Sequence, residues 1–68
     1  MRNKLATKLN MVRTQKNVSL SKLAESIGVD AAFLGHVEKG RRLVSIEVLI
    51  LLAEYFDVST DYLLGWKD

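Results

Sequence analysis

One short stretch of this chain carries the side chains best suited to bind a partner through hydrogen bonds and charge. If residues 31–39 form a helix whose buried side holds Leu34 and Val37, a step of 100° per residue places His36 and Lys39 on the opposite side. The imidazole of His36 can hydrogen-bond a purine N7 or O6, and the ammonium of Lys39 can bind a guanine or a phosphate. This arrangement favours a helix that enters the major groove of DNA.

The neighbours of His36 and Lys39 on this helix are small or apolar. Ala31 and Ala32 permit close approach and can touch thymine methyl groups. Phe33 can pack beneath the preceding helix, which we favour, or meet a thymine methyl or a sugar. A solvated surface histidine with no role is the alternative for His36. The predicted base-reading residues are Ala31, Ala32, Phe33, His36 and Lys39.

Cations flank this helix where phosphates would lie beside a groove. Lys22 precedes it near the start of another predicted helix, and Arg41 and Arg42 follow it. Such contacts position a protein on DNA without reading sequence. Neutralising about four phosphates in each subunit would give a log-log salt slope near −0.9 for each phosphate. A solvated basic loop is the alternative. The predicted phosphate-binding residues are Arg13, Ser19, Ser21, Lys22, Arg41 and Arg42.

The spacing of residues 20–39 is typical of a helix-turn-helix, which would hold these side chains in place. Ala24 is small enough for two helices to cross closely. Gly28 can adopt the left-handed conformation that ends the first helix. The carboxylate of Asp30 is then expected to cap the second helix by accepting from its first amides. We therefore predict helices over 20–27 and 31–39.

Three further helices are expected, over 2–15, 46–56 and 60–64. Apolar spacing defines the first of them, whereas Ser45 and Ser59 are candidate N-caps for the others, as Ser19 is for the helix at 20–27. The chain has 68 residues, of which 49% are hydrophobic, and it has no proline. These features predict a single all-α domain over 1–68 with five helices and no strand.

Charge is divided unequally along the chain. Residues 1–42 hold nine Lys and Arg against three Asp and Glu, a net charge of +6, whereas residues 43–68 have a net charge of −4. The basic part contains the two-helix motif and supplies the field that attracts phosphates. Ordinary surface charge is the alternative interpretation.

Other classes of function are poorly supported. The chain has no cysteine and one histidine, so we expect no metal site, and without a glycine-rich phosphate loop we expect neither a cofactor nor catalysis. Asp57 and Asp61 lie at capping or surface positions. The longest apolar run, residues 48–53, is far shorter than the roughly 20 residues that span a bilayer. We expect a cytoplasmic protein with no membrane span.

The predicted helix at 46–56 has more apolar residues than a core stripe needs. Leu49, Leu52, Ala53 and Phe56 form that stripe, and a second apolar row follows it. Homodimerisation through the second row is our preferred interpretation, with simple core packing as the alternative. The predicted dimer residues are Val48, Leu51 and Tyr55, with Trp66 as a further anchor.

An ion pair is expected between the first helix and the helix at 31–39. Glu38 lies one turn after Leu34 on the core side, where an unpaired carboxylate would be costly. Arg13, one turn after Leu9, is its natural partner. We predict a partly buried Arg13–Glu38 pair in which Arg13 still reaches a phosphate.

From Leu5 to Leu64 the chain resembles the Cro/repressor-type helix-turn-helix family, often called XRE. The matching segments are SLSKLA at 19–24, IGV at 27–29, LGHVEKGRR at 34–42, then Leu49, Leu52 and Ala53, and VSTDYLL at 58–64. The resemblance implies a compact five-helix, lambda-repressor-like fold, cytoplasmic location and dimeric binding to duplex DNA, with repression commoner than activation. Family members also commonly carry Arg and Glu at the positions of Arg13 and Glu38.

The chain departs from the family pattern at several positions. Leu20 replaces a common phosphate-binding glutamine, Val44 replaces a usual proline, and Ala31 and Ala32 stand where polar base-reading residues are usual. We predict a sequence-specific transcriptional regulator, a phage-type or small bacterial repressor that binds an inverted-repeat operator as a dimer. The alternative is a protein-binding adaptor, antirepressor-like or antitoxin-like, that uses the helix at 46–56. Control by a regulatory protein partner is left open.

Overall fold

The computed structural model describes residues 4–66, and within that range every regular element is a helix. The five helices confirm the predicted all-α architecture. Their bounds are α1 Leu5–Gln15, α2 Leu20–Ile27, α3 Ala31–Glu38, α4 Ile46–Phe56 and α5 Thr60–Leu64. The prediction that α1 includes residues 2 and 3 lies outside the described residues, and α3 ends one residue earlier than predicted, with Lys39 as its C-cap.

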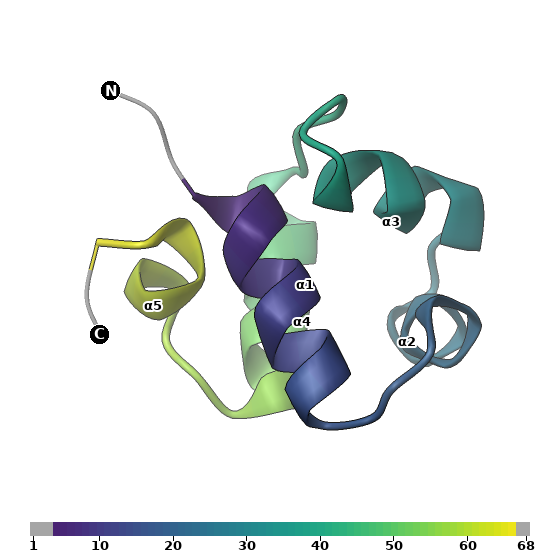
Figure 1. The fold of residues 1–68 in the computed structure, drawn as a ribbon, viewed down its shortest axis with the longest axis horizontal. Helices are drawn as coiled ribbons and strands as arrows, with labels where there is room; N and C mark the ends of the chain where they lie inside the picture. The colour runs from purple at the N-terminus through teal and green to yellow at the C-terminus, as the bar shows by residue number, and fades with distance from the viewer. Residues whose placement is uncertain (1–3, 67–68) are drawn as a thin grey trace.

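The helices surround one apolar core. In Figure 1, α5 lies on one side of α1 and the α2–α3 pair on the other, while α4 runs behind α1 in this view. Each helix contributes at least one buried apolar side chain, so no helix folds independently of the others. The largest fully buried side chains are Leu9, Leu23, Leu34, Val37, Leu52, Phe56 and Leu63. No helix of the described part is long and apolar enough to cross a membrane.

Serine hydroxyls cap three helices, as predicted. The Oγ atoms of Ser19, Ser45 and Ser59 each accept from the backbone N–H three residues later, at 2.9 to 3.1 Å. Such caps satisfy amides that have no partner within the helix. These hydrogen bonds fix where α2, α4 and α5 begin.

Asp30 is the N-cap residue of α3, as predicted, but the predicted hydrogen bond of its carboxylate is absent. Its backbone has the extended conformation of an N-cap, but its side chain makes no capping hydrogen bond. Asp30 is exposed, so water can satisfy the first amides of α3 and the carboxylate can remain solvated. The first amides of α3 therefore have no side-chain cap.

The turn between α2 and α3 has the predicted geometry. Gly28 has φ +79°, and its N–H donates to the Ala24 carbonyl at 2.9 Å, which ends α2. Ala24 is itself buried in the core. The small residue and the left-handed glycine together set the angle at which α3 leaves α2.

Candidate nucleic-acid interface

The α3 helix has one buried side and one solvent-facing side. Leu34 and Val37 are buried in the core, whereas Ala32, His36 and Lys39 are exposed. This division follows from the 100° step between helical residues. The fold thus leaves the polar side chains of α3 free to meet a partner.

Two of the predicted base-reading residues lie at the edge of this exposed side. Ala31 and Phe33 are half-buried, and both pack against the core. Packing is the interpretation that we favour for Phe33 from its sequence. A Cβ added at Gly35 would lie 3.8 Å from Leu20 Cδ1, so α2 and α3 come close there. The centre of the exposed side is consequently formed by Ala32, His36 and Lys39.

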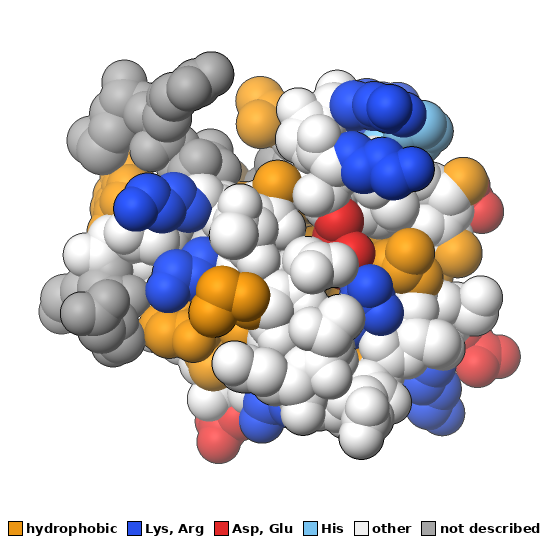
Figure 2. Space-filling model, viewed as in Figure 1, with side chains coloured by type: hydrophobic (Ala, Val, Ile, Leu, Met, Phe, Trp, Pro, Cys, Tyr) orange, Lys and Arg blue, Asp and Glu red, His pale blue; other side chains and the backbone are white. Residues whose placement is uncertain are grey.

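Exposed cations lie on α2 and in the segment after α3. Lys22 on α2 is exposed, as are Arg41 and Arg42 in the segment after α3. Figure 2 shows Lys and Arg side chains grouped directly beside the single histidine, His36. Arg42 Cζ lies 5.5 Å from the centroid of the Phe33 ring, a cation–π contact. These exposed cations, which we call the cationic rim, attract anions such as phosphates.

The two serines predicted to bind phosphate are both exposed. The Ser19 hydroxyl accepts from the Lys22 amide, so its lone pair serves as the α2 cap. Its O–H remains able to donate to an anion, because a hydroxyl both donates and accepts. Ser21 lies in the first turn of α2. The N-terminus of α2 therefore brings Ser19, Ser21 and Lys22 to the same end of the helix.

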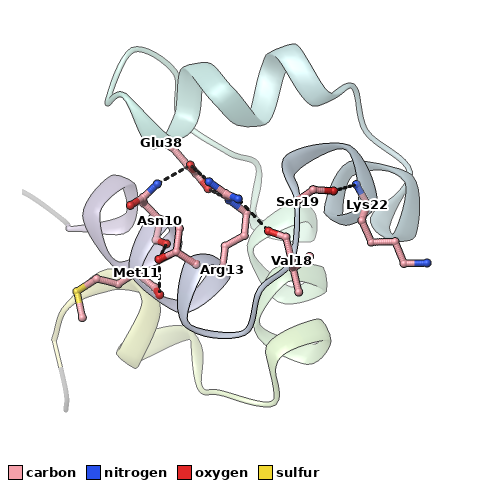
Figure 3. Close-up of polar contacts among 8 residues, drawn as sticks. Asn10, Met11, Arg13, Val18, Ser19, Lys22 and Glu38 are labelled. Atoms are coloured by element: carbon pink, nitrogen blue, oxygen red, sulfur yellow. Dashed lines mark hydrogen bonds and ion pairs between the residues drawn. The ribbon is translucent and has the colours of Figure 1, made fainter.

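The Arg13–Glu38 ion pair is present in the structure (Figure 3). Arg13 Nε donates to Glu38 Oε2 at 2.6 Å, and a second guanidinium nitrogen donates to Oε1 at 3.0 Å. The side chains are 14% and 7% exposed. The hydrogen bond to Glu38 raises the pKa of Arg13 above its ordinary value, against the opposing effect of burial. The pair therefore joins α1 to α3 as a bidentate, charged contact.

Two further contacts of this pair were not predicted. Asn10 Nδ2 donates to Glu38 Oε1 at 2.9 Å, and the remaining terminal nitrogen of Arg13 donates to the Val18 carbonyl at 2.8 Å (Figure 3). Asn10 lies three residues before Arg13 on the same helix, a spacing that signals a shared face. The Val18 carbonyl belongs to a loop, for which no sequence signal exists. These bonds use three of the five N–H groups of Arg13, so it has a structural role and its phosphate contact stays a prediction.

The predicted dimer residues differ in exposure. Val48 is half-buried and packs against the core, one turn before the buried Leu52. Leu51, Tyr55 and Trp66 are exposed.

Sequence reasoning missed the most exposed apolar side chains near α4. Leu43 and Ile46 are 79% and 76% exposed, and Ile50 is exposed as well. The signal for Ile46 and Ile50 was their spacing of one helical turn, which was assigned no role. The outward side of α4 thus has two apolar edges, one with Ile46 and Ile50 and the other with Leu51 and Tyr55.

Residues 4–66 contain no group of three or more His, Cys, Asp or Glu residues that could hold a metal ion. The chemistry available at the site is consequently that of hydrogen bonding, charge and apolar contact.

Comparison with known proteins identifies helix-turn-helix relatives of this chain. The family model described as "Helix-turn-helix" matches residues 4–63. The HTH-type transcriptional regulator AnsR of Bacillus subtilis is 38% identical over 58 residues, which are 85% of this chain and 50% of AnsR. The chain spans about half the length of the curated relatives it matches.

Two solved structures are similar over most of their length. The restriction-modification controller protein C.AhdI from Aeromonas hydrophila has 35% identity and a TM-score of 0.82, covering 88% of this chain and 91% of that protein. SinR of Bacillus subtilis, a master regulator for biofilm formation whose structure was solved in complex with DNA, has 33% identity and a TM-score of 0.82. The match covers 88% of this chain and 97% of the SinR chain.

Proposed function

Because this chain belongs to the Cro/repressor-type (XRE) helix-turn-helix family, we propose that it binds double-stranded DNA through the outward side of α3 and regulates transcription. One observation carries the proposal: an exposed helix face bearing His36 and Lys39 is bordered by further exposed cations. The buried opposite side fixes this helix against the rest of the molecule, so a groove would meet a rigid surface.

We assign base reading to a small set of side chains. His36 and Lys39 donate to base edges, and Ala32 touches thymine methyl groups. Ala31 contributes from the half-buried edge of α3, where Phe33 packs against the core. With so few polar groups on α3, we infer modest sequence discrimination and a large contribution from phosphates to affinity.

Phosphate binding is assigned to the two ends of the motif. Lys22, with Ser19 and Ser21, holds the backbone beside the start of α2, while Arg41 and Arg42 hold it beyond the end of α3. These groups belong to the segments before and after α3, and we propose that they contact the DNA backbone on both sides of one major groove.

A band-shift experiment across a salt series tests this proposal. With random-sequence duplex DNA, we expect binding at low salt that weakens with a log-log slope of about −0.9 for each phosphate neutralised. The K22E/R41E variant should lose this binding while keeping its helical circular dichroism. Absence of binding by the folded wild type at low salt would refute the proposal.

We further propose that the chain forms a single domain over residues 1–68 and acts as a homodimer. The exposed apolar side chains of Leu51 and Tyr55 support a contact between copies, to which Val48 contributes from its half-buried position on α4. Trp66, which follows α5, is exposed as well and is proposed as a further anchor. Sedimentation equilibrium should give twice the monomer mass, and selection from random DNA should return an inverted repeat with half-sites about 34 Å apart.

A dimer seated on a promoter would block transcription by occupying it, and repression is therefore the outcome we propose. An operator fused upstream of a reporter should lose expression when the wild-type protein is present. Expression should be retained with the K22E/R41E variant, which folds but lacks two of the cations proposed to bind phosphate.

A protein-binding adaptor remains the second candidate function. The alanines at the start of α3 and the exposed Leu43 and Ile46 favour it, because apolar surfaces of this kind mark protein contacts. The cationic rim around α3 favours DNA instead. If the wild type binds duplex DNA and the K22E/R41E variant does not, the result supports DNA binding over the adaptor function.

A further inference from the structure

The segment after α3 contains two neighbouring arginines in different surroundings. Arg42 Cζ lies 5.5 Å from the centroid of the Phe33 ring. Within residues 4–66, the Arg41 side chain makes no hydrogen bond, ion pair or ring contact. Both arginines are exposed. The structure therefore holds one guanidinium against the surface and leaves its neighbour free.

Phe33 is itself well placed to hold a cation at the edge of α3. Its ring packs partly into the core, which restricts its rotation, and the half that remains exposed faces Arg42. The face of an aromatic ring is electron-rich and attracts a guanidinium. His36 lies one turn further along α3, so Arg42 is held beside the exposed side of that helix.

Restriction of an arginine before binding has a thermodynamic consequence. A free arginine must give up rotamer freedom when it binds a phosphate, and this loss opposes binding. An arginine already held by a ring has given up part of that freedom in the unbound protein. Arg42 should therefore bind a phosphate more tightly than Arg41, although both carry the same charge.

We propose that Phe33 is a positioning residue that holds the Arg42 guanidinium at the edge of α3, ready to bind a DNA backbone phosphate. This inference rests on the proposed function of DNA binding and names a role for Phe33 other than base reading. The contact persists in the complex, because one face of the guanidinium lies on the ring while its N–H edge remains available to phosphate oxygens.

The test is a double-mutant cycle with a matched control arginine. The probe is a fluorescein-labelled random-sequence duplex at low salt, read by anisotropy. In the wild type and in R41A, F33L should weaken binding about threefold, which lies at the low end of the affinity lost when a rotamer-rich side chain is immobilised on binding. In R42A, where the guanidinium is already absent, F33L should change affinity little.

Salt dependence separates positioning from charge. R41A and R42A should each reduce the magnitude of the log-log salt slope by about 0.9, because each removes one phosphate contact. F33L should leave the slope unchanged, since the charge of Arg42 remains. F33M, whose unbranched side chain adapts to irregular gaps, provides a second variant should F33L prove poorly folded by circular dichroism.

A DNA-free measurement examines the contact itself. The δ-methylene protons of Arg42 should have upfield NMR shifts from the Phe33 ring current, and these shifts should vanish in F33L or F33M. Absence of the upfield shifts in the wild type would overturn the inference.

The binding data have two contrary outcomes of their own. If F33L weakens binding equally in R42A and in R41A, Phe33 acts through the general fold and the inference fails while DNA binding stands. If the folded wild type does not bind the duplex at all, the proposed function fails together with the inference.

Discussion

Replacement of Glu38 by glutamine tests how strongly the α1–α3 contact stabilises the fold. The substitution keeps the shape of the side chain but removes the charge that faces Arg13. In the structure that carboxylate accepts two hydrogen bonds from Arg13 and one from Asn10. The glutamine can keep one carbonyl oxygen as an acceptor, but its amide group would face an N–H donor.

The expected loss of stability can be estimated from burial. Breaking a buried ion pair by removing one partner costs about 3–5 kcal/mol. The Arg13 side chain is 14% exposed and glutamine retains one acceptor. We therefore expect a smaller loss of unfolding free energy, of about 2–3 kcal/mol. A domain of this length has a total stability of only about 3–10 kcal/mol. E38Q should therefore lose a large share of it.

Urea unfolding followed by circular dichroism at several temperatures measures this loss. The matched control is E25Q, the same chemical change at an exposed position of α2, which should lie within about 0.5 kcal/mol of the wild type. In a cycle with R13M, the double variant should be less destabilised than the sum of the two single variants. An E38Q stability equal to that of E25Q would refute our reasoning about this ion pair.

The pH dependence of this contact follows from the sign of the pKa shift. Glu38 raises the pKa of Arg13, so the stability that the shift contributes is fully present below the ordinary arginine pKa and is lost only above it. Arg13 should therefore cause no loss of stability anywhere between neutral pH and about pH 9.

Three other substitutions have defined outcomes. G28A should lower stability by about 1–2 kcal/mol in urea unfolding, because the residue has φ +79° while an added Cβ meets no neighbour, so only backbone strain is added. S45A should cost about 1 kcal/mol in the same assay, since the Val48 amide loses its cap. L51K should convert the proposed dimer to a monomer in sedimentation equilibrium with unchanged helicity, and a wild type that is already monomeric would contradict the dimer.

Much of the fold could be predicted because the relevant signals are local in sequence. Serine caps and the glycine at position 28 act on residues within one turn, and apolar spacing identifies the buried side of each helix. The Arg13–Glu38 pair was accessible for a related reason, since each residue lies one turn beyond a core leucine. The absence of a side-chain cap at Asp30 was not predictable, because the same backbone conformation allows its carboxylate either to accept from a helix amide or to be solvated.

The surface of α4 shows a second limit of sequence reasoning. Val48 and Ile50 are both apolar, and only the direction from which α2 and α5 pack against α4 decides which is covered. The contact of Arg42 with Phe33 depends on the path of the segment between α3 and α4, which has no periodic pattern. Tertiary packing, rather than helical propensity, determines both features.

Amide NMR shifts on addition of duplex DNA test the central claim most directly. If the outward side of α3 binds DNA, the largest shift changes should occur at Ala32, Gly35, His36 and Lys39, with further changes at Lys22 and Arg42 and small ones on α4. Changes concentrated at Ile50 and Leu51, or none at low salt, would contradict the account.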